Sequence, residues 1–479
     1  MNFWSADRRP GPSVPRDRVE SAQPGIDDGD AGGWRSEFQH DHDRLLFSTP
    51  VRRLSDKTQV WPMDENDGVR TRLTHSHEVA NLARSIGSNI ATQRPDLFGA
   101  DLHKVIQPIL SAIGLAHDLG NPPFGHQGEA AIGNWFKKRS GWIFDLDGPD
   151  GKQLDDIVPH YVRTEFTKFD GNPQTFRLIT RLQTHRDYLG LDLTAATLSA
   201  ALKYPVSANS AVEDHPVFGK CGYFESERDV VNWMRERVGI AEKERHPLTW
   251  IMEACDDIAY SILDVDDVMK KKIISPDDVL VILQHDERSK DHPAVEKITR
   301  KFKEIHDLKR SPQVARDIKI GMLRAYLISA LIEDVAKTFL ASSDAVMAKT
   351  HAEAILDENL LCDALKDIAR QHAFAHPSVL KMEALGAEAL DELMSFFWDA
   401  ISKRKKPDDF DSKRTTAMAK YGWSLVSPNY IEAAKLSQQN TGPSSGVRYR
   451  ELRLLTDMVS GMTDSFALNL WNEVRSLPK

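Results

Sequence analysis

The sequence predicts an all-α protein built from many helices. Apolar residues recur at helical spacing from Leu45 almost to the C-terminus, whereas the two-residue alternation of strands is rare. We find no repeat of fixed period. The 479 residues allow two or three domains or one large one. Because no shift in composition separates the helical segments, we expect one large helical assembly.

The helical segments follow an N-terminal stretch of different composition. Residues 1–43 are rich in Pro, Gly, Asp and Arg and lack apolar periodicity, so we expect a polar, flexible arm there. The spacing then predicts helices near 74–92, 103–118, 126–138, 173–186, 192–203, 226–238, 247–270, 276–285, 293–309, 313–340, 350–358, 360–372, 378–400 and 448–475. Gly, Pro and Ser cluster between several of them, which predicts loops.

Composition and charge exclude several classes of protein. The chain has 62 basic and 71 acidic residues, a net charge of −9, which argues against a general nucleic-acid coat. Its three cysteines cannot form a disulfide framework and lack the spacing of metal ligands. The N-terminus has no apolar signal region, and no segment approaches the roughly 20 apolar residues of a membrane span. We therefore expect a cytoplasmic protein without membrane association.

The dipeptide His-Asp occurs five times, and one occurrence stands apart. Those at 40–41 and 42–43 lie in the polar arm, and those at 285–286 and 306–307 lie at charged helix ends. His117-Asp118 instead ends the apolar run VIQPILSAIGLA and is followed at once by LGNPPFGH, whose Gly and Pro residues must stop the helix. Buried imidazole and carboxylate groups need partners, and a metal ion would satisfy both.

A second histidine is expected to point into the core. The residues 4, 7, 11 and 15 positions after His75 are all apolar: Val79, Leu82, Ile86 and Ile90. Taken alone, His75 is more simply a hydrogen-bonded core histidine than a metal ligand.

A further ligand should be an acid on an otherwise apolar helix. Asp256 and Asp257 lie within such a segment, and Asp256 shares its face with Met252, Tyr260 and Asp264. A single buried acid is usually an ion-pair partner. Several acids and a tyrosine on one face of a helix suggest instead that this face binds a metal ion and contacts a substrate. Two histidines and two aspartates suit Mn²⁺, Fe²⁺, Mg²⁺ or Zn²⁺.

These residues and their neighbours resemble the dGTP triphosphohydrolase family of the HD-domain phosphohydrolase superfamily. The similarity extends from about Leu45 to Leu470, and GNPPFGHQGE is its most specific part. The matching segments are RRLSDKTQVWPMDENDGVRTRLTHSHEV (52–79), GLAHDLGNPPFGHQGEAAI (114–132), EACDDIAYSILDVDD (253–267) and SGMTDSFA (460–467).

The resemblance implies a domain organisation and a metal site. Residues 44–275 would form the catalytic core, and 276–479 a helical region packed on it and involved in subunit contacts. The divalent metal would be bound by His75, His117, Asp118 and Asp256. Asp256 is preferred over Asp257 because the motif places a tyrosine four residues later and an aspartate eight residues later. We expect Mn²⁺ or Mg²⁺, with Fe²⁺, Co²⁺ or Zn²⁺ as alternatives.

The resemblance also implies a catalytic pair, His126 and Glu129. Their spacing of three residues at a helix start allows the carboxylate to orient the imidazole, although Glu129 alone could equally stabilise the helix terminus. The similarity further assigns Gln59 and Val60 to the deoxyribose pocket and Tyr260 and Asp264 to the sugar. Contacts to the phosphates are implied for Arg72, Asn172, Lys203 and Tyr204.

The activity implied is metal-dependent hydrolysis of dGTP at the α-phosphate, giving a deoxynucleoside and inorganic tripolyphosphate. Another HD enzyme, such as a 5′-nucleotidase or a broad dNTP triphosphohydrolase, remains an alternative. So does a nucleotide sensor or single-stranded DNA-binding protein. The family often forms even oligomers, so a homo-oligomer, a hexamer first, is expected. The resemblance assigns no residue to the guanine base.

Overall fold

The protein is built from helices, as predicted. The structure is a computed structural model that describes residues 2–10, 34–63, 66, 68–145, 157–307, 309–407 and 409–477. Within these residues the only β pairing is two isolated bridges, Thr58 with Thr71 and Arg404 with Arg414. The all-α fold class is therefore confirmed.

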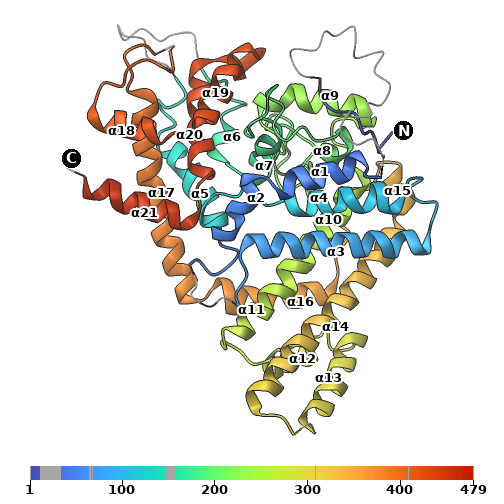
Figure 1. The fold of residues 1–479 in the computed structure, drawn as a ribbon. Helices are drawn as coiled ribbons and strands as arrows, with labels where there is room; N and C mark the ends of the chain where they lie inside the picture. The colour runs from blue at the N-terminus through green and yellow to red at the C-terminus, as the bar shows by residue number, and fades with distance from the viewer. Residues whose placement is uncertain are drawn as a thin grey trace.

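A central group of helices forms one half of the core (Figure 1). Helix α3 (Arg72–Gln93) lies along α4 (Gln107–Ala116), and α10 (Pro247–Ile258) and α14 (Pro312–Ala341) pack against α3. The apolar face expected on α3 is buried, since Val79, Leu82, Ile86 and Ile90 are at most 5% exposed. α1 (Glu37–Leu46) covers α4 from the other side.

A second group of helices packs around α17 (Pro377–Ser402). α5 (Gly125–Lys138) and most of the C-terminal helices contact α17, on the opposite side of the molecule from the N-terminus (Figure 1). The C-terminal helices are α18 (Ala417–Leu425), α19 (Pro428–Leu436), α20 (Val447–Ser460) and α21 (Asp464–Ser476). Trp135 and Phe136 of α5 are fully buried in this second half of the core.

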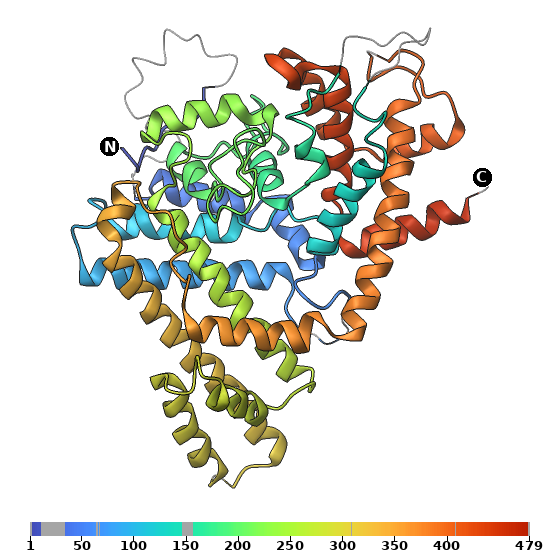
Figure 2. The ribbon, with the colours of Figure 1, turned by 180° about the vertical axis from the view of Figure 1, so that it is seen from behind.

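The remaining α-helices complete the molecule. They are α2 (Thr49–Arg53), α6 (Thr164–Thr167), α7 (Gly171–Thr180), α8 (Ala195–Ala201), α9 (Arg228–Val238), α11 (Asp264–Lys270), α12 (Pro276–His285), α13 (Pro293–His306), α15 (Ser343–Met347) and α16 (Leu360–Ala369). α12, α13 and the first part of α14 project from the body as a separate lobe, seen at the bottom of Figures 1 and 2.

Two π-helical turns interrupt otherwise regular helices near the candidate site. One, Ala259–Leu263, joins α10 to α11, and the other, Arg370–Phe374, follows α16. A π turn inserts an extra residue into the helical register and is frequent at functional sites. The side chains that follow such a turn are rotated from the face that the regular helical period predicts.

The arm predicted over 1–43 is packed wherever the structure describes it. Phe3 and Ser5 are buried, and the carbonyls of Ser5 and Asp7 accept hydrogen bonds from Ala196 and Ala195 at the start of α8. α1 begins at Glu37, inside the predicted arm. The interpretation of a loosely attached arm is therefore wrong for residues 2–10 and 34–43. Residues 11–33 lie outside the described part of the chain.

Two helix predictions also differ from the structure. Residues 350–358 form turns, bounded by the left-handed residues Lys349 and Glu358, although Ile355 and Leu356 are buried. The single helix predicted near 448–475 is two helices, α20 and α21, separated at Gly461. The helices α1, α18 and α19 were not predicted, because their segments are too polar or too rich in aromatic residues for a clear apolar stripe.

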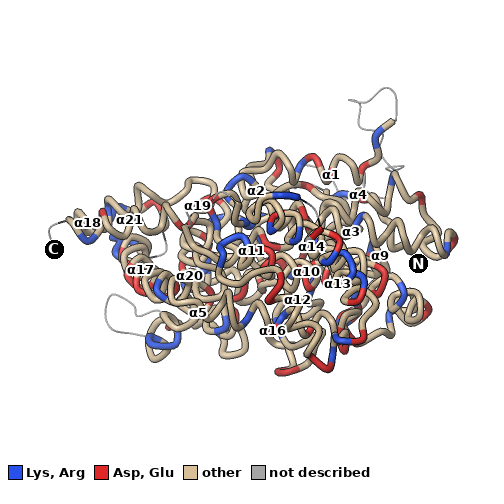
Figure 3. The backbone as a smooth tube through the Cα atoms, turned by 90° about the horizontal axis from the view of Figure 1, so that it is seen from below, with Lys and Arg blue, Asp and Glu red and all other residues tan. Residues whose placement is uncertain are grey.

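Neither sign of charge is gathered in one part of the described backbone (Figure 3). Viewed from below, basic and acidic residues are interspersed along the described backbone (Figure 3). Among the described helices, none is both long and apolar enough to cross a membrane.

Candidate metal centre and active site

Two histidines and one aspartate converge between α3, α4 and α10. Ligand atoms of His75, His117 and Asp256 all lie within 4.8 Å of one another. Nε2 of His75 is 3.3 Å and Nε2 of His117 is 3.4 Å from Oδ1 of Asp256. Ligand atoms at about 2.1 Å from a common ion are about 3.0–3.4 Å apart. The three side chains thus have the spacing of ligands to one metal ion.

The local sequence explains how each group reaches this position. His75 is fully buried because it shares the apolar face of α3. His117 follows the last residue of α4, and its Nδ1 donates to the carbonyl of Gly114 at 2.7 Å. This hydrogen bond places the proton on Nδ1 and leaves the Nε2 lone pair free to bind a cation. Nε2 of His117 and Nδ1 of His75 are buried without a hydrogen-bond partner among the described residues.

The electrostatics of this group also suit a cation. Burial lowers the pKa of His117, but the carboxylates of Asp118 and Asp256 outweigh burial and raise that pKa to about 9. Burial raises the pKa of Asp256, and His117 and Lys203 reverse the effect, so its pKa is held well below the usual range. The negative charge therefore attracts either protons or a metal ion to the two imidazoles.

Asp118, the fourth predicted ligand, is placed differently. Its Oδ2 lies 3.6 Å from Nε2 of His117 but only 2.5 Å from Nη1 of Arg72, and Oδ1 accepts from Asn121 at 2.6 Å. Burial raises its pKa, but Arg72 and then His117 outweigh this and lower that pKa to about 2. Asp118 therefore adjoins the His–His–Asp group while paired with an arginine, and it does not join that group directly.

The neighbouring acid Asp257 faces away from the two histidines. Its Oδ1 pairs with Nζ of Lys366 at 3.1 Å. Adjacent residues on a helix point about 100° apart, so only one of them can reach the histidines. Asp256 is the residue that does so.

The predicted catalytic pair is in contact at the start of α5. Nδ1 of His126 lies 2.8 Å from Oε2 of Glu129, and Oε1 of Glu129 accepts the backbone N–H of Gly171 at 2.7 Å. Glu129 is thus held from two directions and does not cap its own helix. The hydrogen bond to Glu129 raises the pKa of His126.

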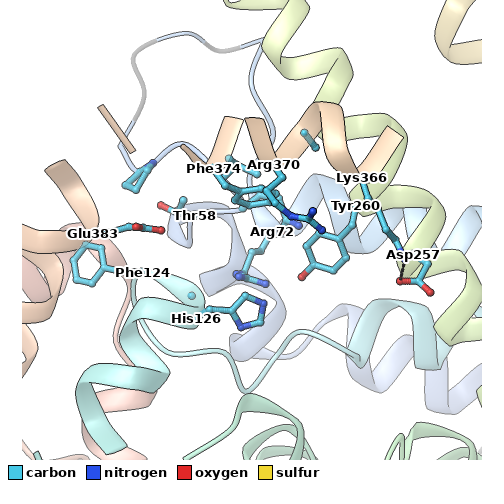
Figure 4. Close-up of a pocket in the computed structure, with 15 residues that line it drawn as sticks. Thr58, Arg72, Phe124, His126, Asp257, Tyr260, Lys366, Arg370, Phe374 and Glu383 are labelled. Carbon is cyan, nitrogen blue, oxygen red and sulfur yellow. Dashed lines mark ion pairs between the residues drawn. The ribbon is translucent and has the colours of Figure 1, made fainter. Parts of the chain in front are cut away.

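A cavity of about 320 Å³ opens beside these groups (Figure 4). Its walls come from the segment before α3, the start of α5, the π turn of α10–α11, and α16 with its π turn and α17. Of the predicted site residues, it is lined by Gln59, Val60, Arg72, His126 and Tyr260. Both polar atoms of the Gln59 side chain are buried without a partner within the described residues.

Four predicted substrate residues do not line this cavity. Asp264 is buried beyond the π turn, and its two carboxylate oxygens have no partner among the described residues. Asn172, Lys203 and Tyr204 lie elsewhere, on the segments around α7 and α8.

Polar contacts link Asn172, Lys203 and Tyr204 to the His–His–Asp group. Nζ of Lys203 is 3.5 Å from Oδ2 of Asp256 and 5.9 Å from the ring centroid of Tyr204. Lys220 lies 6.0 Å from the same ring and 3.0 Å from Asp170, which also accepts from Asn172. A set of cations and polar groups thus adjoins Asp256 on a side separate from the cavity.

Sequence reasoning missed several residues of the site. Lys366, Arg370, Phe374 and Glu383 line the cavity from the C-terminal half, and Lys220 adjoins Tyr204. No spacing in the sequence relates these residues to His75 or His126. Only the packing of α16 and α17 against the core brings them together. The one weak signal in the sequence was an arginine and a phenylalanine, Arg370 and Phe374, close together after α16.

Comparisons with known proteins agree with this geometry. Residues 72–172, which contain His75, His117 and the His126–Glu129 pair, match the HD domain family. The chain is 32% identical over 452 residues to the deoxyguanosinetriphosphate triphosphohydrolase-like protein of Listeria monocytogenes, covering 92% of this chain and 94% of the relative. The protein of the same description from Listeria innocua has the same identity and coverage. With this similarity along nearly its whole length, the chain belongs to the dGTP triphosphohydrolase family of HD-domain proteins.

Proposed function

We propose that this protein hydrolyses deoxynucleoside triphosphates, dGTP first, at the α-phosphorus. The products would be a deoxynucleoside and inorganic tripolyphosphate. The observation that carries the proposal is the position of the cavity. The oriented His126 ring and Arg72 line it, and Arg72 pairs with Asp118 beside the His–His–Asp group.

The metal would be held by His75, His117 and Asp256, with Asp118 as a fourth ligand once it exchanges part of its contact with Arg72. Mn²⁺ or Mg²⁺ is our first choice, since mixed imidazole and carboxylate ligands suit both a borderline and a hard cation. When bound, the cation would polarise the α-phosphoryl oxygen and offset its negative charge.

The nucleoside would occupy the cavity. Val60 and Gln59 would lie against the deoxyribose, where a close wall leaves no room for a 2′-hydroxyl, and Tyr260 would face the sugar. Phe374 offers an aromatic face for stacking on a base. The carboxylate of Glu383 can accept from both N1–H and the N2 amino group of guanine, which supports dGTP over the other nucleotides.

The triphosphate would extend from Arg72 toward the polar contacts around Tyr204. Arg72 would bind the α-phosphate, and Lys203, Tyr204 and Asn172 the outer phosphates. A triphosphate carries several negative charges and requires several cations, and Lys220 adds one next to Lys203.

His126 would act on the attacking water. With Nδ1–H donated to Glu129, Nε2 is free to take a proton from water as its oxygen bonds to the α-phosphorus. The bond from phosphorus to the 5′-oxygen then breaks. The deoxynucleoside leaves with a proton, and the tripolyphosphate retains the oxygen from water.

One experiment tests this reaction directly. The protein is incubated with each dNTP, with GTP and with dGMP, in Mn²⁺ or Mg²⁺, and the products are identified by mass. Tripolyphosphate with deoxyguanosine supports the proposal. Orthophosphate from a deoxynucleoside monophosphate would indicate a 5′-nucleotidase, and similar rates with all four dNTPs would indicate a broad triphosphohydrolase.

We also propose that the chain acts as a homo-oligomer, with a hexamer favoured. Light scattering after size-exclusion chromatography tests this assembly. Single-stranded DNA binding is the remaining alternative, and the interspersed charges in Figure 3 do not favour it. A salt-dependent binding assay with single-stranded DNA decides whether a second role is needed.

A further inference from the structure

The carboxylate of Asp464 joins two segments of the candidate site that are far apart in the sequence. Asp464 is the first residue of α21 and is 1% exposed. Its Oδ2 accepts the backbone N–H of Thr58 at 3.0 Å and also the Thr58 hydroxyl. Its Oδ1 accepts the backbone N–H of Phe124 at 3.1 Å. Both oxygens are therefore used outside α21.

On one side Asp464 holds the proposed deoxyribose wall. Thr58 immediately precedes Gln59 and Val60, and all three line the cavity. The segment before Thr58 is also tied to the end of α20 and the start of α21. Nζ of Lys57 donates to the carbonyl of Ser460 at 3.0 Å, and Oγ of Ser465 donates to Asp56 at 2.7 Å.

On the other side Asp464 holds the residue that starts α5. Phe124 has φ 62°, a left-handed conformation that is strained for a residue with a side chain. Such a conformation persists only when its surroundings enforce it. The hydrogen bond from its N–H to Asp464 is one constraint, and His126 follows only two residues later.

Helix capping does not account for this arrangement. An acid in the first turn of a helix is favourable in general. The cap of α21, however, is supplied by Thr463, whose hydroxyl accepts from the N–H of Phe466. The Asp464 carboxylate instead accepts three hydrogen bonds from Thr58 and Phe124.

We propose that Asp464 is a positioning residue that fixes the wall against the deoxyribose relative to the His126–Glu129 pair. This role rests on the proposed function and deepens it. One buried carboxylate sets the distance between the group that discriminates the sugar and the group that moves the proton. Loss of Asp464 should therefore impair selectivity for the deoxy sugar and turnover together.

Asp464→Asn is the most informative variant because it keeps the size of the side chain. An amide has one acceptor oxygen and one NH₂ group. Whichever way it turns, it presents a donor to the N–H of either Thr58 or Phe124. We expect kcat for dGTP to fall about 10-fold to 100-fold, as small misplacements of catalytic groups do. The ratio of kcat/KM for dGTP to that for GTP should fall at least about 10-fold.

Asp41→Asn is the matched control. Asp41 is also fully buried and also accepts the N–H and the hydroxyl of one threonine, Thr194, at 3.0 and 2.6 Å. It lies at the junction of α1 and α8, away from the cavity. The Asp41→Asn variant should lose stability as Asp464→Asn does, but its ratio of kcat/KM for dGTP to kcat/KM for GTP should equal that of the wild type. An unchanged ratio in Asp464→Asn as well would overturn the proposal.

Hydrogen exchange gives a second measurement that does not depend on activity. In Asp464→Asn only one of the two amides faces the NH₂ group and loses its acceptor, but because this side chain couples the two segments, the amides of Thr58 and Phe124 should both exchange faster. In Asp41→Asn the affected amide should be that of Thr194. Faster exchange at only one of the two segments would show that Asp464 does not couple them, and the inference would fail.

Two further outcomes separate this inference from the proposed function. If the wild-type protein hydrolyses no nucleotide, the proposed function fails, and the exchange data alone decide whether Asp464 couples the two segments. If Asp464→Asn does not fold, Thr58→Val removes only the hydroxyl contact. It should still lower the dGTP/GTP ratio, and no change in that ratio would overturn the inference.

Discussion

Glu129 orients the ring of His126 through a hydrogen bond of 2.8 Å between Oε2 and Nδ1. The other oxygen of Glu129 is fixed by the backbone of Gly171 at the start of α7. The His126 side chain is nevertheless 72% exposed at the edge of the cavity. The imidazole is therefore held at one nitrogen and accessible at the other, which is the arrangement that a proton carrier needs.

Replacement of His126 tests this assignment. His126→Ala should lower kcat by at least about 100-fold, because proton transfer is lost, with metal content and melting temperature unchanged. Steady-state kinetics with dGTP and elemental analysis measure these effects. His77→Ala is the control, since His77 is exposed on α3. Equal activity of the two variants would remove His126 from the mechanism.

The two adjacent aspartates of α10 should differ in metal binding. Asp256→Ala removes the carboxylate that both histidines face, so the protein should retain little Mn²⁺ after dialysis and should have little activity. Asp257→Ala removes the ion pair with Lys366 in the cavity wall and should retain the metal. Metal content by mass spectrometry decides between them. Loss of the metal in Asp257→Ala alone would contradict the proposed ligand set.

Glu383 should determine the preference for guanine. Glu383→Gln would replace one acceptor by a donor and lose a charge-assisted hydrogen bond of about 1.5–3 kcal/mol. The preference for dGTP over dATP, measured as a ratio of kcat/KM values, should fall about 10-fold or more. Glu388→Gln on the same helix is the control, since Glu388 is exposed. A preference that survives in Glu383→Gln would place base recognition elsewhere.

His246 should make stability depend on pH. Burial outweighs its contact with the carbonyl of Phe3 and lowers the pKa of His246 to about 4. Because the unfolded chain takes up this proton near pH 6.5, the stability contribution is present above that pH and is lost as the pH falls toward 4. Between pH 7 and pH 5 the free energy of unfolding should fall by about 2 kcal/mol from this group.

The measurement is urea unfolding of the wild type and of His246→Asn at both pH values. Asparagine keeps an acceptor at this N-cap position but does not titrate. The difference in unfolding free energy between the two proteins should shrink on going from pH 7 to pH 5. A constant difference would show that His246 does not couple protonation to folding.

The features that follow from local spacing could be predicted from the sequence. The helical period of α3 placed His75 on a face with Val79 and Ile86, and all three are buried. The three-residue spacing of His126 and Glu129 predicted their contact, because such residues are neighbours on a helix surface. Both inferences need only the geometry of one helix.

The features that depend on long-range packing or on an irregular backbone could not be predicted. Asp264 follows a π turn and does not line the cavity that Tyr260 lines, although the two residues are four positions apart. Phe3 and Ser5 are buried by contacts with residues more than 180 positions away. Their segment has no helical periodicity of apolar residues, so the sequence did not indicate that these residues would be buried.

The sequence by itself determined the helical class, the core face of α3, and the residue types that can bind a divalent cation. Tertiary structure alone decided that Glu383 and Phe374 share a cavity with His126, and that Asp464 links Thr58 to Phe124. The physical reason is the separation along the sequence of the residues that interact. A helical period is set by neighbouring residues, whereas which distant side chains meet depends on how whole helices pack to bury their apolar faces.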